Sequence, residues 1–408
     1  MEKKKKPAIR FKGFTDSWEQ RKLGDVAEYR NGQGHEDKQS DYGKYELVNL
    51  NSISIDGGLK PSGRFVDEAQ DTLLKDDLVM VLSDVGHGDL LGRVALIPEN
   101  NRFVLNQRVA LLRVTDNTDV RFLFSIINAN QRYFKREGAG SSQLNISRDS
   151  VENFIVDSPT VDEQKKIGTY FDTLDHLITL HQRKYDKLQI IKKSMLEKMF
   201  PQSGSCFPEI RFKGFTDSWE QRKLGDMASS FEYGLNAAAK AYDGENKYIR
   251  ITDIDDNTHK FLTDSLTSPD IDLTGADNYK LTEGDILFAR TGASVGKSYI
   301  YRNSDGLVYY AGFLIRARIN EEYDKEFVFQ NTLTDRYNKY IAVTSQRSGQ
   351  PGVNAQEYAE FEINVPKKEE QTKIGTYFRN LDHLITLHQR EVEKLQNIKK
   401  SMLETMFV

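Results

Sequence analysis

Residues 163–200 read EQKKIGTYFDTLDHLITLHQRKYDKLQIIKKSMLEKMF, and residues 370–407 read EQTKIGTYFRNLDHLITLHQREVEKLQNIKKSMLETMF. The two stretches lie 207 positions apart and carry the same residue at 30 of 38 positions. Neither contains proline, and neither contains glycine beyond its first turns, so each is predicted to form one uninterrupted helix. Such a helix extends about 57 Å at 1.5 Å per residue.

Large residues recur in both copies at alternating spacings of four and three, which is the pattern of a coiled-coil seam. A long helix with a polar back cannot bury such a stripe alone, so we expect the two copies to pair. One His and one Lys interrupt each seam, and we interpret them as register or partner-docking positions. The seam comprises Ile167, Phe171, Leu174, Ile178, His181, Tyr185, Leu188, Lys192, Met195 and Met199, then Ile374, Phe378, Leu381, Ile385, His388, Val392, Leu395, Lys399, Met402 and Met406.

A second duplication precedes the first. Residues 9–25 read IRFKGFTDSWEQRKLGD, and residues 210–226 repeat all 17 of them. The chain therefore consists of two tandem halves, each with a leader, a middle segment and a long helix. Trp18 and Trp219, the only tryptophans, occupy matching positions and are expected to anchor the core. The predicted domains are 1–160 and 201–367, with spacer helices at 161–200 and 368–408.

The two middle segments, 26–160 and 227–367, share almost no sequence but show the same predicted order of elements. Apolar runs bounded by turn residues predict strands, which are followed by a helical segment, a polar loop and a short strand, as in mixed α/β domains. Function is expected in the loops, because divergent segments on a repeated scaffold face different targets. The predicted strands are 45–50, 78–82, 93–97, 108–114 and 153–156, then 248–251, 285–289, 298–301, 313–319 and 360–365, and the helical segments are 120–133 and 326–340.

Composition narrows the class of protein. A chain of 408 residues is long enough for two or more domains, each with its own core. No run of 18 apolar residues is present, and the lysine-rich start is not followed by an apolar segment, so neither a membrane span nor a signal peptide is expected. Cys206 is the single cysteine, which excludes a disulfide framework and fits the cytoplasm. The net charge of -4 argues against coating nucleic acid by bulk charge but allows a local basic face.

Two motifs that suggest small-ligand sites are better explained structurally. The run GASVGKS at 292–298 has three residues between its glycines where a phosphate loop needs four, and a strand-like run follows it, so we predict a tight hairpin. His176 and His181 recur as His383 and His388, but a spacing of five places them poorly on one helical face. No metal site is expected there.

No catalytic set assembles from the sequence. No two prolines are adjacent, so the Pro-Pro-Tyr type of motif of an amino-methylating enzyme is absent, and no glycine-rich turn or serine elbow accompanies a cofactor or triad. We therefore expect a non-catalytic protein that binds neither metal nor cofactor itself.

The polar loops carry the positive signal. Residues 140–145 and 347–354 combine glycines with Ser, Gln, Asn and Arg, whose side chains can read base edges: Gln or Asn reads adenine, and Arg reads guanine. Other polar residues at strand ends could contact phosphates or bases. The candidate DNA-binding residues are Ser83, His87, Gln107, Arg108, Ser141, Ser142, Gln143 and Asn145, then Arg290, Thr291, Ser294, Lys297, Arg347, Ser348, Gln350 and Asn354.

This layout resembles the specificity subunit of a type I restriction–modification enzyme, over nearly the whole chain. The resemblance rests on the duplicated leader ending in WEQRKLGD, on the entry EQxKI to each long helix, and on GDILFARTGASVG at 284–296 and QLNIS at 143–147. The corresponding first-half stretch, DLVMVLS at 77–83, departs from that pattern.

The resemblance implies an α+β chain with a pseudo-twofold tandem repeat. In it, two target recognition domains each read one half of a split double-stranded DNA site. Two long antiparallel helices separate them and dock two methylation subunits through the apolar seam residues. The partners would hold the chemistry: methylation subunits bind S-adenosylmethionine, and motor-nuclease subunits use ATP and Mg.

Charge and length agree with that expectation. Two readers on one face of B-DNA should lie about 34–36 Å apart, which helices of about 57 Å can span. The two helices together carry a charge of +4, which leaves -8 for the rest of the chain. The isolated chain is therefore expected to bind DNA weakly and with strong salt dependence. The main alternative is a non-catalytic coiled-coil adaptor whose middle segments bind proteins; a self-sufficient methyltransferase fragment is disfavoured by the missing motifs.

Overall fold

The computed structural model describes residues 7–85, 87–115, 117–140, 143–202 and 204–407. The chain divides into two compact units. The first unit contains residues 1–182 and 390–408, and the second contains residues 183–389. Each unit therefore holds one middle segment together with parts of both long helices. In the described part of the chain, no helix is long and apolar enough to cross a membrane.

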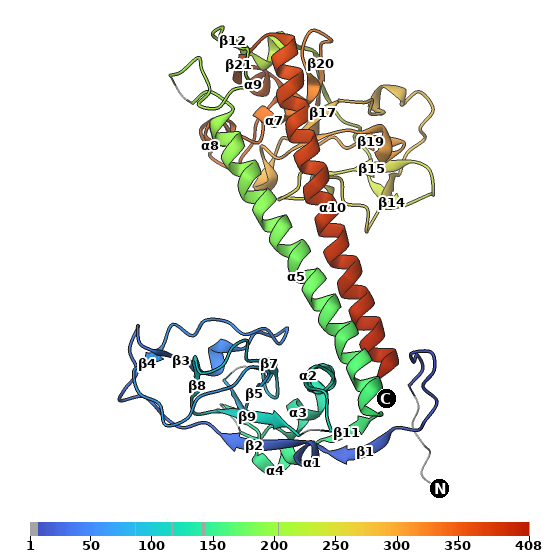
Figure 1. Ribbon diagram of the computed structural model, residues 1–408. Helices are drawn as coiled ribbons and strands as arrows, with labels where there is room; N and C mark the ends of the chain where they lie inside the picture. Colours follow the sequence, from blue (N-terminus) through green and yellow to red (C-terminus); the bar gives the residue numbers. More distant parts are fainter. Residues whose placement is uncertain (1–6, 86, 116, 141–142, 203, 408) are drawn as a thin grey trace. The chain divides into compact units, whose positions relative to one another are not determined.

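The two duplicated stretches form the two longest helices, α5 (Val161–Lys198) and α10 (Lys368–Met406), drawn green and red in Figure 1. Their bounds lie within two residues of the duplicated stretches. Each helix starts after a proline, and a buried glutamine fixes that start. Gln164 donates to the carbonyl oxygen of Pro159 at 2.9 Å and accepts from the backbone N–H of Asp119 at 3.0 Å. Gln371 repeats this bridge with Pro366 and Asp324, at 2.8 and 3.0 Å.

A four-stranded antiparallel sheet forms the centre of each middle segment, with the same strand order in both. Some of its strands alternate buried and exposed side chains, and others bury all of their apolar side chains, with helices packed on one side. Both patterns are those of sheet strands, which is why the predicted runs form strands. In the first unit the order is β2 (Ala27–Asn31), β9 (Val109–Val114), β5 (Leu78–Val81), β7 (Val94–Leu96). In the second it is β13 (Ala228–Tyr233), β20 (Leu314–Ile319), β17 (Ile286–Ala289), β18 (Ser298–Ile300).

Shorter pairings extend this frame in both units. A parallel pair, β3 (Tyr45–Val48) with β8 (Phe103–Leu105) in the first unit and β15 (Lys247–Ile249) with β19 (Val308–Tyr310) in the second, packs a smaller core. The leader strands β1 (Glu19–Lys22) and β12 (Glu220–Lys223) pair with β11 (Ile155–Ser158) and β21 (Glu362–Val365). The remaining strands are β4 (Phe65–Val66), β6 (Ser83–Asp84), β10 (Leu144–Asn145), β14 (Ala239–Ala241) and β16 (Thr267–Pro269).

The helical segments predicted at 120–133 and 326–340 are each broken in two, which corrects the prediction of single helices. The first consists of α2 (Val120–Ala129) and α3 (Gln131–Glu137), separated at Asn130, whose side chain donates back to the carbonyl of Ile126 at 2.8 Å. The second consists of α7 (Lys325–Asn331) and α8 (Asp335–Thr344). Such side-chain to backbone bonds compete with helix continuation, and Thr334 caps the restart of α8. The other short helices are α1 (Leu23–Val26), α4 (Arg148–Glu152), α6 (Leu224–Met227) and α9 (Ala355–Ala359).

The duplicated leaders bind the start of each long helix. Arg10 makes two hydrogen bonds to Glu163, at 2.6 and 2.7 Å, and Glu163 is fully buried. Arg211 and Glu370 repeat this fork at 2.7 Å. A buried carboxylate is tolerated when a guanidinium satisfies both of its oxygens. The identical leaders therefore place the same charged contact in both units.

The end of each long helix completes the core of one unit. In the first unit, Phe407 stacks on Phe171 near the start of α5, with ring centroids 5.6 Å apart. In the second unit, Phe200 stacks on Phe378 near the start of α10, at 5.8 Å. Within each unit, then, the start of one helix packs against the end of the other. Trp18 and Trp219 are buried in these same cores, as the sequence predicted.

In both units, the start of the leader is hydrogen-bonded to the end of a long helix. The backbone N–H of Ile9 donates to the carbonyl of Thr405 at 3.1 Å, and that of Ile210 donates to Lys198 at 2.9 Å. Both leaders thus start beside the end of a long helix. In the second unit that helix, α5, precedes the leader in sequence, whereas in the first it is the C-terminal helix α10.

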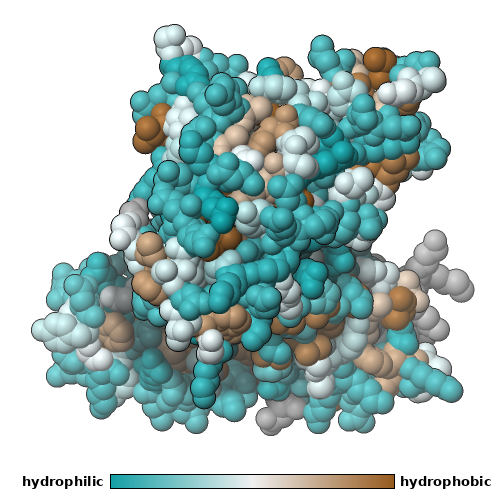
Figure 2. Space-filling view, turned by 90° about the horizontal axis from the view of Figure 1, so that it is seen from above, coloured by the Kyte–Doolittle hydropathy of each residue, from teal (hydrophilic) through white to brown (hydrophobic). Residues whose placement is uncertain are grey.

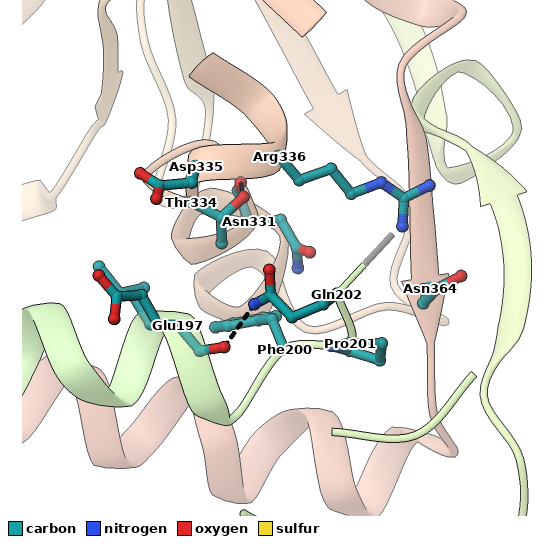
Figure 3. Close-up of a pocket in the computed structure, with 10 residues that line it drawn as sticks. Glu197, Phe200, Pro201, Gln202, Asn331, Thr334, Asp335, Arg336 and Asn364 are labelled. Atoms are coloured by element: carbon teal, nitrogen blue, oxygen red, sulfur yellow. Dashed lines mark hydrogen bonds between the residues drawn. The ribbon is translucent and has the colours of Figure 1, made fainter. Parts of the chain in front are cut away.

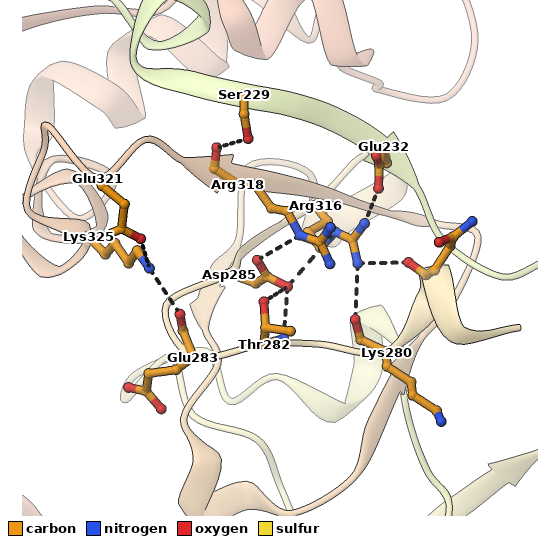
Figure 4. A network of polar contacts seen from close by, with 11 residues as sticks. Ser229, Glu232, Lys280, Thr282, Glu283, Asp285, Arg316, Arg318, Glu321 and Lys325 are labelled. Carbon is orange, nitrogen blue, oxygen red and sulfur yellow. Dashed lines mark hydrogen bonds and ion pairs between the residues drawn. The ribbon is translucent and has the colours of Figure 1, made fainter.

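The two central sheets differ in one buried charge network. Figure 4 shows Arg316 and Arg318 of β20 converging on Asp285. Arg316 is fully buried and also donates to the backbone carbonyls of Asn278 and Lys280. In the first unit a single fork, Arg113 to Asp77 at 2.7 and 2.8 Å, takes this place. The shared frame therefore holds different interiors, as the divergent sequences require.

Candidate nucleic-acid interface

Both units tie a polar loop to the end of the central strand by the same backbone hydrogen bonds. In the first unit, the N–H of Leu82 donates to Arg108, and the N–H of Ile146 donates to Leu82, both at 2.9 Å. In the second, Arg290 donates to Phe313 at 3.1 Å, and Val353 donates to Arg290 at 2.9 Å. The residues on either side of these bonds therefore lie together, although they are far apart in sequence. We call the region around Leu82, Arg108 and Ile146 the first polar edge. The region around Arg290, Phe313 and Val353 is the second polar edge.

The first polar edge includes three of the candidate DNA-binding residues in direct contact. The hydroxyl of Ser83, on β6, donates to Oδ1 of Asn145, on β10, at 2.8 Å. The amide of Gln143 donates to the same hydroxyl, and Nδ2 of Asn145 donates to the carbonyl of Gln143 at 3.2 Å. Ser83 is buried beneath the other two, which are half-buried and exposed. The amides are thus held at the surface by a buried hydroxyl, an arrangement that fixes their orientation.

Arg108, Gln107 and His87 lie beside this cluster or in adjoining loops. Arg108 is exposed and adopts a left-handed backbone conformation with φ of 66°. The Gln107 amide donates to the carboxylate of Glu36. His87 is exposed in the loop after β6. Ser141 and Ser142 lie outside the described residues.

Electrostatics in the His87 loop favour a charged carboxylate rather than a proton donor. Asp89 pairs with Lys135 at 2.9 Å, and this lysine, with a smaller contribution from His87, holds the pKa of the Asp89 carboxyl below its ordinary value. A carboxylate with a lowered pKa stays charged near neutral pH and is a poor general acid or base. The loop therefore offers polar contacts but no acid/base pair.

The second polar edge is built around the hairpin between β17 and β18. Thr291 bridges to Gly352, and the N–H of Gly292 donates to the carbonyl of Pro351 at 3.0 Å. Gly292 has φ of 75°, and a Cβ there would meet the Gln350 amide nitrogen at 2.9 Å, so the turn and the loop approach closely. Ser294 lies in the short 3-10 turn Gly292–Ser294, and β18 begins four residues later at Ser298. The predicted hairpin at 292–298 is confirmed.

Three of the other candidates in this edge are committed to contacts within the chain. The Lys297 ammonium, 10% exposed, pairs with Asp256 at 2.5 Å and donates to the carbonyl of Ile254 at 2.9 Å. Arg347 pairs with Glu357 at 2.5 Å and donates to the end of α8 at the carbonyl of Thr344. Asn354 caps α9, where its side chain accepts from the N–H of Glu357 at 2.9 Å. Ser348 is exposed.

Arg290 differs from these cations. It forms no ion pair within residues 204–407, and its guanidinium lies over two aromatic rings, those of Tyr233 and Phe313. Neither aromatic residue is among the candidates predicted from the sequence. Phe313 stands at the start of a predicted strand and Tyr233 at the end of β13, and only the fold shows that they meet at Arg290. Exposed aromatic residues at strand ends would have been the available signal.

The hollow at the end of α5 is too small for a cofactor. Figure 3 shows a cavity of about 20 Å³ in the second unit, at the end of α5, lined by Phe200, Gln202 and Arg336 among others. That volume holds about one water molecule. Within the described residues, no group of three or more His, Cys, Asp or Glu side chains is arranged to hold a metal ion. The face seen in Figure 2 is largely hydrophilic, with hydrophobic residues scattered over it.

The chain matches a known protein family in both halves. The model of the family described as type I restriction modification DNA specificity domain matches residues 15–189 and again residues 216–397. The chain is 21% identical over 298 residues to the type I restriction enzyme MjaVIII specificity subunit of Methanocaldococcus jannaschii, covering 71% of this chain and 69% of that protein. It is 22% identical over 424 residues to the putative type I restriction enzyme MjaX specificity subunit of the same organism, covering 96% and 93%.

A solved structure shows the same fold over the whole length. It is the crystal structure of a type I restriction-modification system S subunit from M. genitalium, with a TM-score of 0.66 and 16% identity, covering 99% of each chain. The tandem arrangement of two mixed α/β domains is therefore shared with that protein.

Proposed function

We propose, from the premise that this chain belongs to the family of type I restriction modification DNA specificity domains, that it is the DNA-recognition subunit of a type I restriction–modification complex. The single observation that carries this proposal is the double match of the family model, one match for each middle segment. The adaptor alternative, in which the middle segments bind proteins, is not favoured by that family.

Each middle segment reads one half of a split site in double-stranded DNA. The support is that both units place polar loop residues on one backbone frame with different side chains. The first polar edge presents Gln143, Asn145 and Arg108, and the second presents Arg290, Thr291 and Gln350. A common frame with different hydrogen-bonding groups suits two different base sequences, because base edges differ in their donors and acceptors.

The two long helices form one antiparallel coiled coil that acts as the spacer between the readers. The support comes from within each unit, where the start of one helix packs on the end of the other. The apolar seam residues at those ends are buried, including Ile167, Phe171 and Leu174 in α5 and Ile374, Phe378 and Leu381 in α10. Residues that pair helices in this way are not available to a partner subunit.

Docking of the methylation subunits therefore uses a different face of the helices. Leu180 and its repeat Leu387 are 38% and 45% exposed, and Leu384, one turn before Leu387, is 41% exposed. Neighbouring exposed leucines on a helix offer apolar surface of the kind that a partner subunit covers. Their duplication suits a partner present in two copies. The methylation subunits supply S-adenosylmethionine-dependent chemistry, and motor-nuclease subunits supply the steps that use ATP and Mg.

Co-purification and methylation mapping test this function. The chain expressed with its candidate methylation subunits should form a complex that methylates adenines in one bipartite sequence. Replacing residues 26–160 by the middle segment of another member of the family should change one half of that sequence only. A change in both halves, or in neither, would contradict the modular reading.

A charge-based measurement tests the dependence on partners. The isolated chain should bind duplex DNA weakly, because a chain of net charge -4 is not attracted to DNA as a whole. The affinity that local basic side chains provide should fall as salt rises from about 50 to 200 mM, because it depends on their contacts with phosphates. Tight, sequence-specific binding by the chain alone would contradict this. Leu180→Asp with Leu387→Asp should release the methylation subunits, whereas Gln143→Ala and Gln350→Ala should alter recognition and leave the complex assembled.

A further inference from the structure

The second polar edge contains a cation held between two exposed aromatic rings. The guanidinium carbon of Arg290 lies 5.0 Å from the ring centroid of Tyr233 and 5.9 Å from that of Phe313. Tyr233 is at the end of β13 and Phe313 comes just before β20, and these two strands pair with each other. Arg290 follows β17, which pairs with the other edge of β20. Three strands of one sheet thus deliver the three side chains to one place.

Neither ring has a role in the core of the second unit. Phe313 is 58% exposed and Tyr233 is 44% exposed, whereas the other aromatic residues of the same sheet, such as Phe288 and Tyr299, are buried. The Tyr233 hydroxyl accepts a hydrogen bond from the N–H of Ala355 at 3.3 Å, at the start of α9, which fixes its ring. Exposed aromatic residues that surround an arginine are typical of a recognition surface.

The rings and the backbone together fix the arginine. The Arg290 N–H donates to Phe313 and its carbonyl accepts from Val353, so the main chain is held on both sides. Cation–π contact then restricts the guanidinium plane without using its N–H donors. A guanidinium with a fixed plane and free donors matches the two acceptors on the major-groove edge of guanine, O6 and N7.

The equivalent positions in the first unit carry different residues. The shared backbone bonds align Arg290 with Leu82 and Phe313 with Arg108. Gly32 and Gly234 donate to Val109 and Leu314 in the same way, which aligns Tyr233 with Asn31. The aromatic pair therefore occurs in one of the two polar edges only. The cation of the first edge, Arg108, stands on a different strand end.

We infer that Tyr233 and Phe313 are specificity-determining residues of the second recognition domain, because they position Arg290 to read a guanine in its half of the DNA site. This inference rests on the proposed function. Arg290 is the residue that contacts the base, and the two aromatic residues are positioning residues. The half-site read by the first domain takes its own cation from Arg108 and does not depend on the aromatic pair.

The test is methylation of a randomised DNA library by the assembled complex, with the base preference measured at every position of both half-sites. Arg290→Lys, which keeps the charge but loses the paired donors, should reduce the preference for guanine at one position of the second half-site by about 5- to 150-fold. Phe313→Leu and Tyr233→Leu should weaken the same position, and Phe313→Tyr should retain it. Tyr233→Phe, which keeps the ring but loses the hydroxyl that accepts from Ala355, should weaken the position less than Tyr233→Leu does. Phe207→Leu, which alters another exposed aromatic residue of the second unit (51% exposed), should change neither half.

The outcomes separate this inference from the function on which it rests. If the wild-type complex methylates a bipartite site but Arg290→Lys and Phe313→Leu leave the second half-site unchanged, the inference is wrong and the proposed function stands. If the variants reduce methylation at all sites equally, Arg290 and its two aromatic neighbours have no role in specificity, and the inference is also wrong. If no sequence-specific methylation occurs with any partner, both are wrong.

Discussion

Lys192 of α5 and Asp382 of α10 form an ion pair at 2.7 Å in the second unit, and Lys399 and Asp175 form its repeat at 2.5 Å in the first. Both members of one pair lie 207 positions from their counterparts in the other. The lysine that interrupts each predicted seam is therefore paired with a carboxylate on the other long helix. A polar residue with a single possible partner favours one alignment of two helices over others.

Breaking this pair should destabilise the second unit. Lys192→Met leaves Asp382 partly buried without its cation, so we expect the free energy of unfolding to fall by about 1–2 kcal/mol, between the values for exposed and buried pairs. The reversed pair, Lys192→Asp with Asp382→Lys, should recover part of that loss. Urea unfolding followed by Trp219 fluorescence in a Trp18→Phe background measures both. Equal losses in the single and reversed variants would show that the pair does not set register.

The fork between a leader and a long helix should matter more, because its carboxylate is fully enclosed. Glu370 is 1% exposed and receives two hydrogen bonds from Arg211. Glu370→Ala leaves the guanidinium without its partner, and we expect a loss of about 3 kcal/mol. Glu369→Ala, at the exposed neighbouring position, is the matched control and should change stability little. The comparison uses the same Trp219 signal, and a similar effect of the two variants would contradict this account.

A glycine in each long helix is required by the close approach of another helix. A Cβ on Gly375 would lie 2.3 Å from the Asp324 carboxylate that caps α7 and 3.1 Å from the N–H of Phe327. Gly375→Ala should therefore lower the melting temperature, with a free-energy cost of about 1–3 kcal/mol. Gly349→Ala, where a Cβ would meet no atom within 4 Å, is the control. If Gly375→Ala left the free energy of unfolding unchanged, α7 would be able to move away from the helix without loss of stability, which would contradict this account.

The end of α10 should stabilise the first unit specifically. Phe407 contacts Phe171 and Phe122, with ring centroids 5.6 and 5.8 Å apart, and is 8% exposed. Phe407→Ala should cost about 3 kcal/mol in a unit that contains the start of the chain. Trp18 fluorescence, read in a Trp219→Phe background, should show the loss. Phe200→Ala should instead destabilise the unit that contains Trp219. If Phe407→Ala affected the Trp219 signal and Phe200→Ala the Trp18 signal, the packing of each helix end in its unit would be contradicted.

A half-buried histidine should make the second unit sensitive to acid. Burial lowers the pKa of His259, helped by the nearby Lys192 and Lys297 and opposed by Asp382 and by the 3.0 Å bond to the carbonyl of Ser298. The unfolded chain then binds the proton more readily than the folded one. Stability from this group is present above the unfolded pKa of about 6.5 and is lost as the pH falls toward the lowered folded value.

The matched variant for that prediction is His259→Asn. His259 has φ of 54°, which asparagine tolerates, and an amide can donate in place of the ring nitrogen. Unfolding measured between pH 7 and pH 5 should show a smaller loss for this variant than for the wild type. An identical pH dependence of the two proteins would show that His259 does not titrate in this range.

The sequence alone determined the two long helices, their seam and the duplicated leaders. Those features depend on local periodicity and on identical stretches, and an identical stretch folds in the same way twice. The positions of several strands in the middle segments could be predicted from apolar runs and turn residues, but their order in the sheet could not. The breaks at Asn130 and before Thr334 did not follow, because each depends on a side-chain hydrogen bond rather than on periodicity.

Only the tertiary structure decided which polar residues have free functional groups. Lys297 and Arg347 have the composition of a DNA-binding loop, but Asp256, earlier in the chain, and Glu357, further along it, pair with them. Asn354 is engaged locally, where it caps α9. Arg290 instead meets aromatic rings from two neighbouring strands. Contacts between residues far apart in sequence set the charge and exposure of each side chain, and local sequence does not contain that information. Likewise, only packing shows that the end of one long helix lies against the start of the other. Phe407 and Phe171 are at opposite ends of the repeat and meet only in the folded first unit.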